Sequence, residues 1–192
     1  MDKKGIQLIL VITLYFINLH SFGQLVSKEI SSTQVEKVND YQKLYEQSLK
    51  EENNVAAANC LNKIAYIYWD HGSLLDAHKY FIQSLELNYS IGNINAVRTI
   101  STNLGMILNE VGKYEEAIKY FNESLKVNKQ MAKKDAICGD IINIALSHSY
   151  SGNYQVAIGY LEQALNLAKE INDIKLIKRC YGALAENHEK LG

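Results

Sequence analysis

The sequence predicts an all-α protein in which pairs of antiparallel helices stack into an α-solenoid. Three observations lead to this fold class: the sequence resembles itself at intervals of 40 residues, its apolar residues recur with helical spacing, and its 192 residues include no proline. Self-similarity with a period of roughly 20 to 50 residues is typical of solenoids. Because proline breaks helix interiors, its absence is compatible with long helices throughout.

Composition and charge exclude several other classes of protein. With 47% hydrophobic and 21% charged residues, the chain is too apolar for intrinsic disorder. Its 20 Lys and Arg residues are balanced by 21 Asp and Glu residues, which leaves no cationic excess to neutralise phosphates. We therefore expect no nucleic-acid partner. Three cysteines without a C-x-x-C motif exclude a disulfide scaffold and a zinc ribbon.

The N-terminus has the layout of a secretory signal peptide, which we assign to residues 1–23. A short, mostly basic segment at residues 2–4 precedes an apolar stretch at residues 6–19, and the small residues Ser21 and Gly23 follow. The apolar stretch has 14 residues, whereas a membrane-spanning helix needs about 20. We expect export to the periplasm or cell surface. The alternative is an uncleaved anchor, and membrane association is expected only in that case or if the chain continues.

Two segments separate the signal peptide from the repeats. Residues 24–34 are polar, with a Ser-Ser-Thr cluster, and are expected to form a flexible lead. Residues 35–53 are expected to be a degenerate first repeat that consists of a single helix. Its inward-facing residues recur with helical spacing. They are Val38, Tyr41, Tyr45 and Leu49.

Five sets of residues repeat with a spacing of 40 and define the units. The sets are Gly72, Gly112, Gly152 and Gly192; Ala77, Ala117 and Ala157; Tyr80, Tyr120 and Tyr160; Leu85, Leu125 and Leu165; and Ala65, Gly105, Ala145 and Ala185. We assign three full units to residues 54–93, 94–133 and 134–173. Residues 174–192 are expected to be the first helix of an incomplete fourth unit, left without a second helix to cover it.

Each unit is expected to contain two helices. In the first unit, Leu61, Ile64, Ala65 and Tyr68 recur at i, i+3, i+4 and i+7, which marks one face of a helix. Gly72 follows, and glycine just beyond a last turn is the usual end of a helix because it enters the left-handed region without a Cβ penalty. A second apolar stripe then marks the second helix of the unit.

The small residues are expected where the two helices of a unit cross. In the second unit, Gly105 and Ala117 would let the helices approach closely, and large residues would fill the remaining gap. One pair cannot bury its apolar face alone, so the pairs must stack.

These residues resemble the tetratricopeptide repeat (TPR) family, and the second unit matches the family pattern best. The matching residues are Gly105 in the first helix, the Gly-Lys-Tyr-Glu-Glu-Ala segment at 112–117, Phe121, and Ser-Leu at 124–125. The period of 40 exceeds the usual period of about 34, and the family's first-helix Trp and closing Pro are absent. The chain resembles the longer-repeat TPR subclass that is common in bacterial sensor and regulator proteins.

The resemblance implies that the first helices of the units line a concave groove that binds a protein or peptide. The matching positions are Asn59, Asn62, Tyr66, Trp69, Thr99, Thr102, Asn103, Met106, Asn109, Ile142, Asn143, Leu146 and Ser149. Asparagine offers a peptide backbone both a donor and an acceptor, while Tyr and Trp are frequent binding hot spots. The alternative is that the asparagines bond to neighbouring helices and hold the repeats in register, and that Trp69 packs near Tyr45.

No residue pattern indicates catalysis, a cofactor or a metal. Nucleotide-binding and hydrolase motifs are absent, so we expect no enzyme. His148 and His188 share a repeat position, but a metal site normally needs three or four ligands. The matching groove positions also lack the basic residues with which some TPR proteins grip acidic chaperone tails.

Two functions are compatible with these expectations. The first is a non-catalytic scaffold that acts outside the cytoplasm and binds a protein or peptide in its concave groove. The second is the extracytoplasmic sensor region of a longer signal-transduction protein, a histidine kinase or a helix-turn-helix regulator, of which this chain is a fragment. If the chain is not a fragment, the uncovered helix at residues 174–192 is expected to fray or to self-associate.

Overall fold

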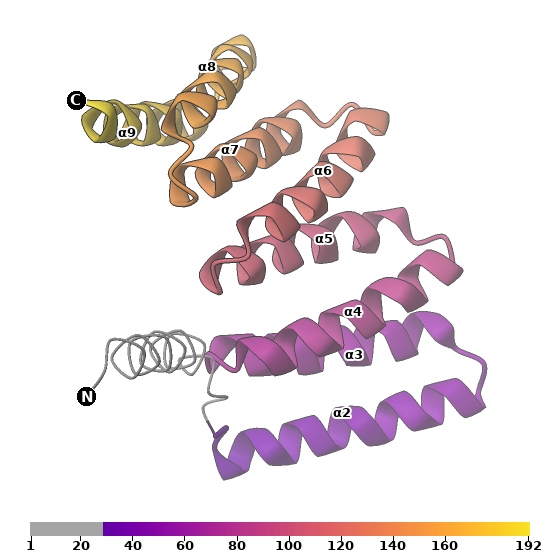
Figure 1. The fold of residues 1–192 in the computed structure, drawn as a ribbon. Coiled ribbons are helices and arrows are strands. Elements are labelled where there is room, and N and C mark those ends of the chain that lie inside the picture. Colours follow the sequence, from indigo (N-terminus) through magenta and orange to yellow (C-terminus); the bar gives the residue numbers. More distant parts are fainter. Residues whose placement is uncertain (1–28) are drawn as a thin grey trace, which may run out of the picture.

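A computed structural model describes residues 29–192, which form a stack of helices without strands (Figure 1). The helices are α2 (Ser32–Lys50), α3 (Asn54–Asp70), α4 (Leu74–Ser90), α5 (Ile94–Glu110), α6 (Tyr114–Gln130), α7 (Lys134–Tyr150), α8 (Tyr154–Glu170) and α9 (Ile174–Leu191). The signal peptide assigned to residues 1–23 lies outside the described residues, as does the first part of the lead.

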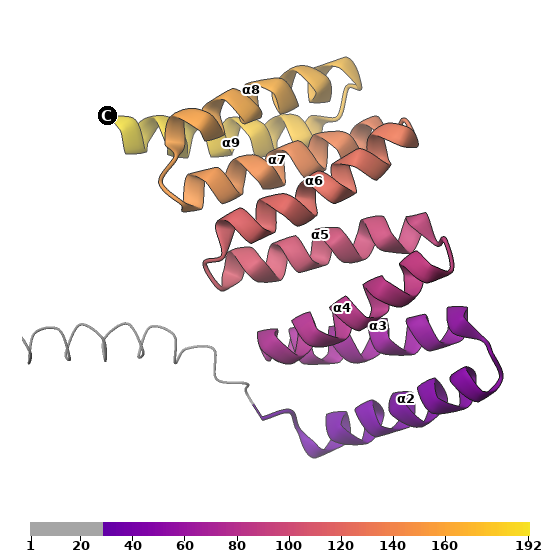
Figure 2. The same ribbon diagram turned by 45° about the vertical axis from the view of Figure 1, so that its right-hand side comes forward.

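The helices follow one another as antiparallel neighbours, and a new helix begins every 20 residues from α3 onward. The pairs α3–α4, α5–α6 and α7–α8 lie in chain order along the stack, with α2 at one end and α8 and α9 together at the other (Figure 2). This arrangement confirms the predicted α-solenoid. Among residues 29–192, no helix is both long and apolar enough to cross a membrane.

Glycine ends the first helix of each pair. Gly72, Gly112 and Gly152 have φ values of 75°, 77° and 82°, in the left-handed region that favours glycine. The next residue then reaches back five positions: the Ser73 N–H, for example, donates to the Tyr68 carbonyl at 2.9 Å. These bonds satisfy carbonyl groups that the end of the helix leaves free. The 40-residue spacing of these glycines in the sequence therefore marks the turns between the two helices of each pair.

Helix α2 begins three residues before the predicted start at residue 35. Ser31 and Gln34 form a capping box, in which the Ser31 backbone N–H donates to the Gln34 side-chain oxygen at 2.9 Å. Such a box satisfies donors that are otherwise free at a helix start. Residues 32–34 of the expected flexible lead therefore belong to the helix.

The closest approach within a pair occurs at Gly105. A Cβ atom at this position would lie 2.6–2.8 Å from ring carbons of Phe121, so only glycine leaves room for that ring. Phe81, Phe121 and Leu161 stand at equivalent positions and are fully buried. A large side chain of the second helix thus fills the space above a small residue of the first, as the repeat pattern predicted.

Candidate functional site

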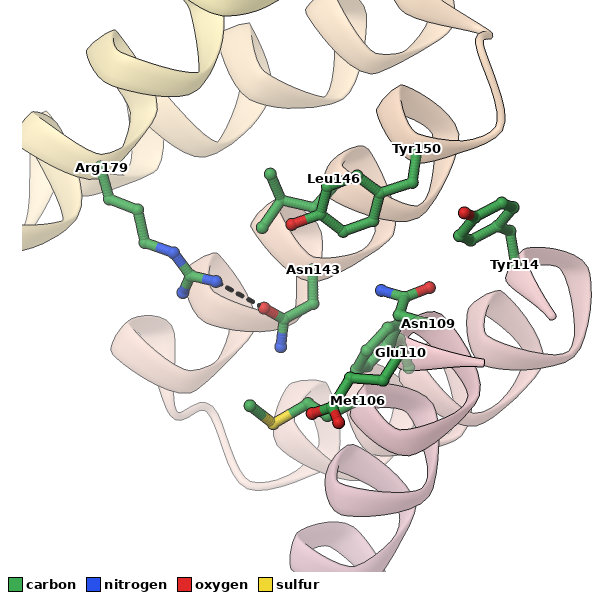
Figure 3. Close-up of a pocket in the computed structure, with 9 residues that line it drawn as sticks. Met106, Asn109, Glu110, Tyr114, Asn143, Leu146, Tyr150 and Arg179 are labelled. Atoms are coloured by element: carbon green, nitrogen blue, oxygen red, sulfur yellow. Dashed lines mark hydrogen bonds between the residues drawn. The ribbon is translucent and has the colours of Figure 1, made fainter. Parts of the chain in front are cut away.

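The main candidate site is a pocket of about 430 Å³ lined by α5, α6, α7 and α9 (Figure 3). We call the first helix of each pair helix A and this site the helix-A pocket, because most of its residues come from these first helices. Its lining residues are Met106, Asn109, Glu110, Tyr114, Phe121, Asn143, Leu146, Tyr150 and Arg179. They derive from three successive repeat units, so the stacking of units creates the pocket.

Apolar and aromatic groups form much of the pocket surface. Met106 is 43% exposed and Leu146 is half-buried, so both can still contact a ligand. The rings of Tyr114 and Tyr150 lie together along one side, with centroids 6.1 Å apart and planes inclined by 43°. Tyr150 is 57% exposed. Rigid aromatic surface of this kind gives large contact area at low cost in conformational entropy.

Two asparagines supply hydrogen-bonding groups to the same pocket. The Asn109 side-chain oxygen accepts a bond from the Ser147 hydroxyl at 2.9 Å. The Asn143 side-chain oxygen accepts one from Arg179 Nη2 at 2.7 Å. Both amides are therefore held in place by their oxygen atoms. Within residues 29–192 neither amide nitrogen donates a hydrogen bond, which leaves two NH₂ groups available to acceptors of a ligand.

Two charged side chains complete the pocket. Glu110 and Arg179 are both exposed, and in Figure 3 Arg179 lies on one side of Asn143 while Glu110 lies with Asn109 on the other. Glu110 accepts a long hydrogen bond of 3.4 Å from Trp69 Nε1. The pocket therefore combines an apolar surface, free amide donors and one charge of each sign.

The structure brings four of the thirteen predicted binding residues into the helix-A pocket: Met106, Asn109, Asn143 and Leu146. Tyr66, Trp69 and Asn103 lie together on α3 and α5, one unit closer to the N-terminus. The Asn103 amide donates to the Tyr66 hydroxyl at 2.7 Å, and the rings of Tyr66 and Trp69 are 6.2 Å apart. Asn103 thus links neighbouring units, as the alternative reading of the asparagines required.

The remaining predicted residues are not part of the pocket. The hydroxyls of Thr99 and Thr102 donate to carbonyls of their own helix, and Thr102 also donates to Ser124. Ile142 is fully buried and packs in the core. Asn59 is exposed, while Asn62 and Ser149 are half-buried, and none of them lines the pocket.

Sequence reasoning missed Glu110, Tyr114, Tyr150 and Arg179. A signal existed for Arg179, since it occupies the repeat position of the predicted residue Thr99, two units further on. Extension of the predicted groove into residues 174–192 would have included it. For the tyrosines, the repeat pattern places Tyr114 at the start of the second helix of one unit and Tyr150 at the end of the first helix of the next unit, without showing that the two rings meet.

The histidines and cysteines do not form a metal site in the described part of the chain. His148 stacks on Tyr160 with ring centroids 5.4 Å apart, and burial lowers the pKa of its imidazole. Cys60, Cys138 and Cys180 are buried free thiols, as expected of residues that pack as small hydrophobic groups.

Comparison with known proteins supports the assignment from the repeats. Residues 96–170 match the sequence model of the family described as tetratricopeptide repeat. No curated protein sequence matches the chain significantly.

Solved structures share the fold at low sequence identity. BtubC from P. vanneervenii superposes with a TM-score of 0.68 at 18% identity, over 82% of this chain and 68% of that protein. The apo form of RapI gives a TM-score of 0.74 at 16% identity, over 83% of this chain and 44% of RapI. A signal transduction ATPase with a tetratricopeptide repeat sensor, from Pyrococcus horikoshii, gives 0.54 at 21% identity, over 80% and 27%.

These findings agree with the repeat spacing, the paired helices and the glycine turns. The fold is typical of scaffolds for protein–protein interaction, and members of the family are generally non-catalytic. Over residues 96–170 the sequence matches the tetratricopeptide repeat, and over the described residues the chain has the fold of tetratricopeptide repeat proteins.

Proposed function

We propose that the protein is a non-catalytic scaffold that binds an extended segment of a partner protein in the helix-A pocket. The observation that carries the proposal is the pairing of an exposed apolar surface with two oriented amide groups. Met106 and Leu146 offer the apolar surface, and the free NH₂ groups of Asn109 and Asn143 lie beside it. An extended peptide presents the matching features, which are alternating side chains and unpaired backbone carbonyls.

The pocket is preorganised for such a ligand. Its asparagines are already held by Ser147 and Arg179, and the Tyr114 and Tyr150 rings already contact each other. Binding therefore orders few additional side chains, which reduces the entropy cost of association. The contacts require no chemical step, so the proposed role is recognition.

A displayed library of short random peptides, panned against the purified protein, tests this function. We expect enriched peptides whose binding is weakened about tenfold or more by Tyr150→Ala, because aromatic residues in binding pockets are common hot spots. Tyr89→Ala is the matched control: Tyr89 is 50% exposed on α4 and does not line the pocket. Failure to enrich any peptide, or equal effects of the two substitutions, would overturn the proposal.

We also propose that this binding takes place outside the cytoplasm. The support is the N-terminal sequence, in which a basic segment at residues 2–4, an apolar stretch at residues 6–19 and small residues at 21 and 23 follow in the order of a signal peptide. N-terminal sequencing of the protein from the cells that make it should find Gln24 first. An intact Met1 on a cytoplasmic product would refute this part of the proposal.

A further inference from the structure

We propose that the helix-A pocket selects segments in which an acidic side chain stands next to a large apolar one, and that Arg179 binds the carboxylate. This inference rests on the proposed function and specifies the ligand of the same site. It follows from the way in which Arg179 is held, the space beside it and the position of Glu110.

One nitrogen of the Arg179 guanidinium is hydrogen-bonded within the protein, and the rest of the group is free to bind a ligand. Its Nη2 donates to the Asn143 side-chain oxygen at 2.7 Å, which directs the guanidinium from α9 across to α7 (Figure 3). A guanidinium carries five N–H donors, so this bond leaves most of them free. Among the ion pairs of residues 29–192, none involves Arg179. The pocket thus contains a permanent, oriented and unneutralised positive charge, which suits a planar carboxylate.

The surface next to this charge is open. Gly139 lies on α7, one helical turn before Asn143, at the repeat position that Arg179 occupies on α9. A Cβ atom on Gly139 would meet no other group within 4 Å. A ligand side chain therefore has room beside Asn143, and from there it can reach the guanidinium group of Arg179.

Glu110 sets the direction in which the ligand binds. It lies on the far side of the pocket from Arg179, beside Met106 and Asn109 (Figure 3). Its negative charge repels an acidic ligand residue there and favours a basic or neutral one. An extended segment is therefore expected to place its acidic residue towards α9 and its apolar residue on Met106 and Leu146.

The carboxylate is assigned to a side chain inside the segment and not to a free C-terminus. The pocket supplies a single cation, and its other donors are neutral: the asparagine amides and the hydroxyls of Tyr114 and Tyr150. One oriented arginine matches one carboxylate, and peptides that are fused at both ends distinguish a side-chain carboxylate from a free C-terminus.

Peptide display can test this specificity directly. Short random peptides fused at both ends, so that no free terminus is present, should be enriched for Asp or Glu at a fixed spacing from a large apolar residue. The Arg179→Glu variant should weaken these peptides about tenfold, the scale of one strong charge-assisted contact, and should instead select Lys or Arg at the same position. Lys178→Glu is the matched control, because it makes the same charge change on a neighbouring exposed residue of α9 outside the pocket.

The outcomes separate this inference from the proposed function. Enriched peptides that depend on Tyr150 but lack an acidic residue, or that bind Arg179→Glu and Lys178→Glu equally, would overturn the inference and leave the function intact. A matched library with free C-termini is panned in parallel, and peptides enriched only there would also overturn the inference. Failure to enrich any peptide in either library, or binding that is insensitive to Tyr150→Ala, would overturn the function itself.

Discussion

Two boundaries between repeat units use the same positions with opposite chemistry. Where α6 meets α7, the three positions at the contact are Ser124, Asn128 and Asp140. Where α8 meets α9, residues exactly one period later in the chain are Ala164, Ala168 and Cys180. All six side chains are buried. One boundary is therefore polar and the other apolar, although the backbone arrangement is the same.

The polar boundary is a hydrogen-bonded network around a buried carboxylate. Asp140 is only 3% exposed. It accepts bonds from the Ser124 hydroxyl at 3.0 Å and from the Asn128 amide at 2.6 Å. Burial raises the pKa of Asp140, while these hydrogen bonds and the charge of Arg98 act in the opposite direction. In the described residues Asp140 has no ion-pair partner.

The apolar boundary replaces these groups with methyl groups and thiols. Cys138 takes the repeat position of Arg98, and its thiol donates to the Ala164 carbonyl at 3.2 Å. Burial raises the pKa of Cys138 to about 11, with a further contribution from Cys180. Each boundary is thus internally consistent, with either several polar partners or none. The residues at the three positions of a boundary must therefore change together, since an isolated buried charge is strongly destabilising.

The largest expected effect comes from breaking the apolar boundary with one polar residue. Cys180→Asp would place a carboxylate in the buried cluster that contains Ala164 and Ala168, which offer no side-chain donor. We expect the free energy of unfolding to fall by roughly 3 kcal/mol or more, as for other unpaired buried charges. Urea denaturation followed by circular dichroism measures this change.

A transplant of the polar network sharpens the same test. Ala164→Ser and Ala168→Asn, added to Cys180→Asp, reproduce the residues of the other boundary and should recover part of the lost stability through new hydrogen bonds. If the triple variant is no more stable than Cys180→Asp alone, the two boundaries are not equivalent in the way proposed here.

The next effect concerns pH and the polar boundary alone. Because the folded pKa of Asp140 lies above the ordinary value of 3.8, the folded state holds the proton more tightly than the unfolded state. The contribution of Asp140 to stability is therefore most favourable at low pH and declines as pH rises from about 3.8 through the folded pKa. Asp140→Asn removes this titration and keeps an oxygen that can accept from Ser124.

The stability of Asp140→Asn relative to the unaltered protein should accordingly rise with pH, because only the unaltered protein loses the favourable contribution of the protonated carboxyl. Asn128 can adapt, because its side-chain oxygen has no hydrogen-bond partner in the described structure and its amide can rotate towards the new NH₂ group. Urea denaturation between pH 4 and pH 8 provides the measurement, with Asp135→Asn on the exposed start of α7 as control. A parallel pH dependence for both variants would contradict the role of burial at Asp140.

The repeat spacing predicted the fold well because it reflects local rules. Gly72 and its equivalents mark turns that glycine favours, and Gly105 marks a contact that a Cβ would block. The pocket was predictable only in part. Met106 and Asn143 follow from their positions on one face of a helix, whereas the contact of Tyr114 with Tyr150 depends on how successive pairs are rotated against each other. Such rotations arise from the packing of whole helices and leave no short pattern in the sequence.

The smallest expected effect compares the turns that enter the two boundaries. Ala132 follows α6 and Asn172 follows α8, with φ values of 52° and 55°. This left-handed conformation costs an ordinary residue such as alanine roughly 1–2 kcal/mol, whereas asparagine adopts it more readily. The equivalent positions after α2 and α4 are Glu52 and Gly92. Ala132 is therefore more strained than Asn172.

Ala132→Gly should stabilise the protein by about 0.5 kcal/mol, since relief of the strain exceeds the entropy that glycine adds to the unfolded chain. Asn172→Gly should give a change near zero or slightly unfavourable, because asparagine has little strain to lose. Thermal unfolding of the two variants side by side measures the difference. If Asn172→Gly proves the more stabilising of the two, backbone strain does not distinguish these turns, and the two boundaries differ only in the side chains that they bury.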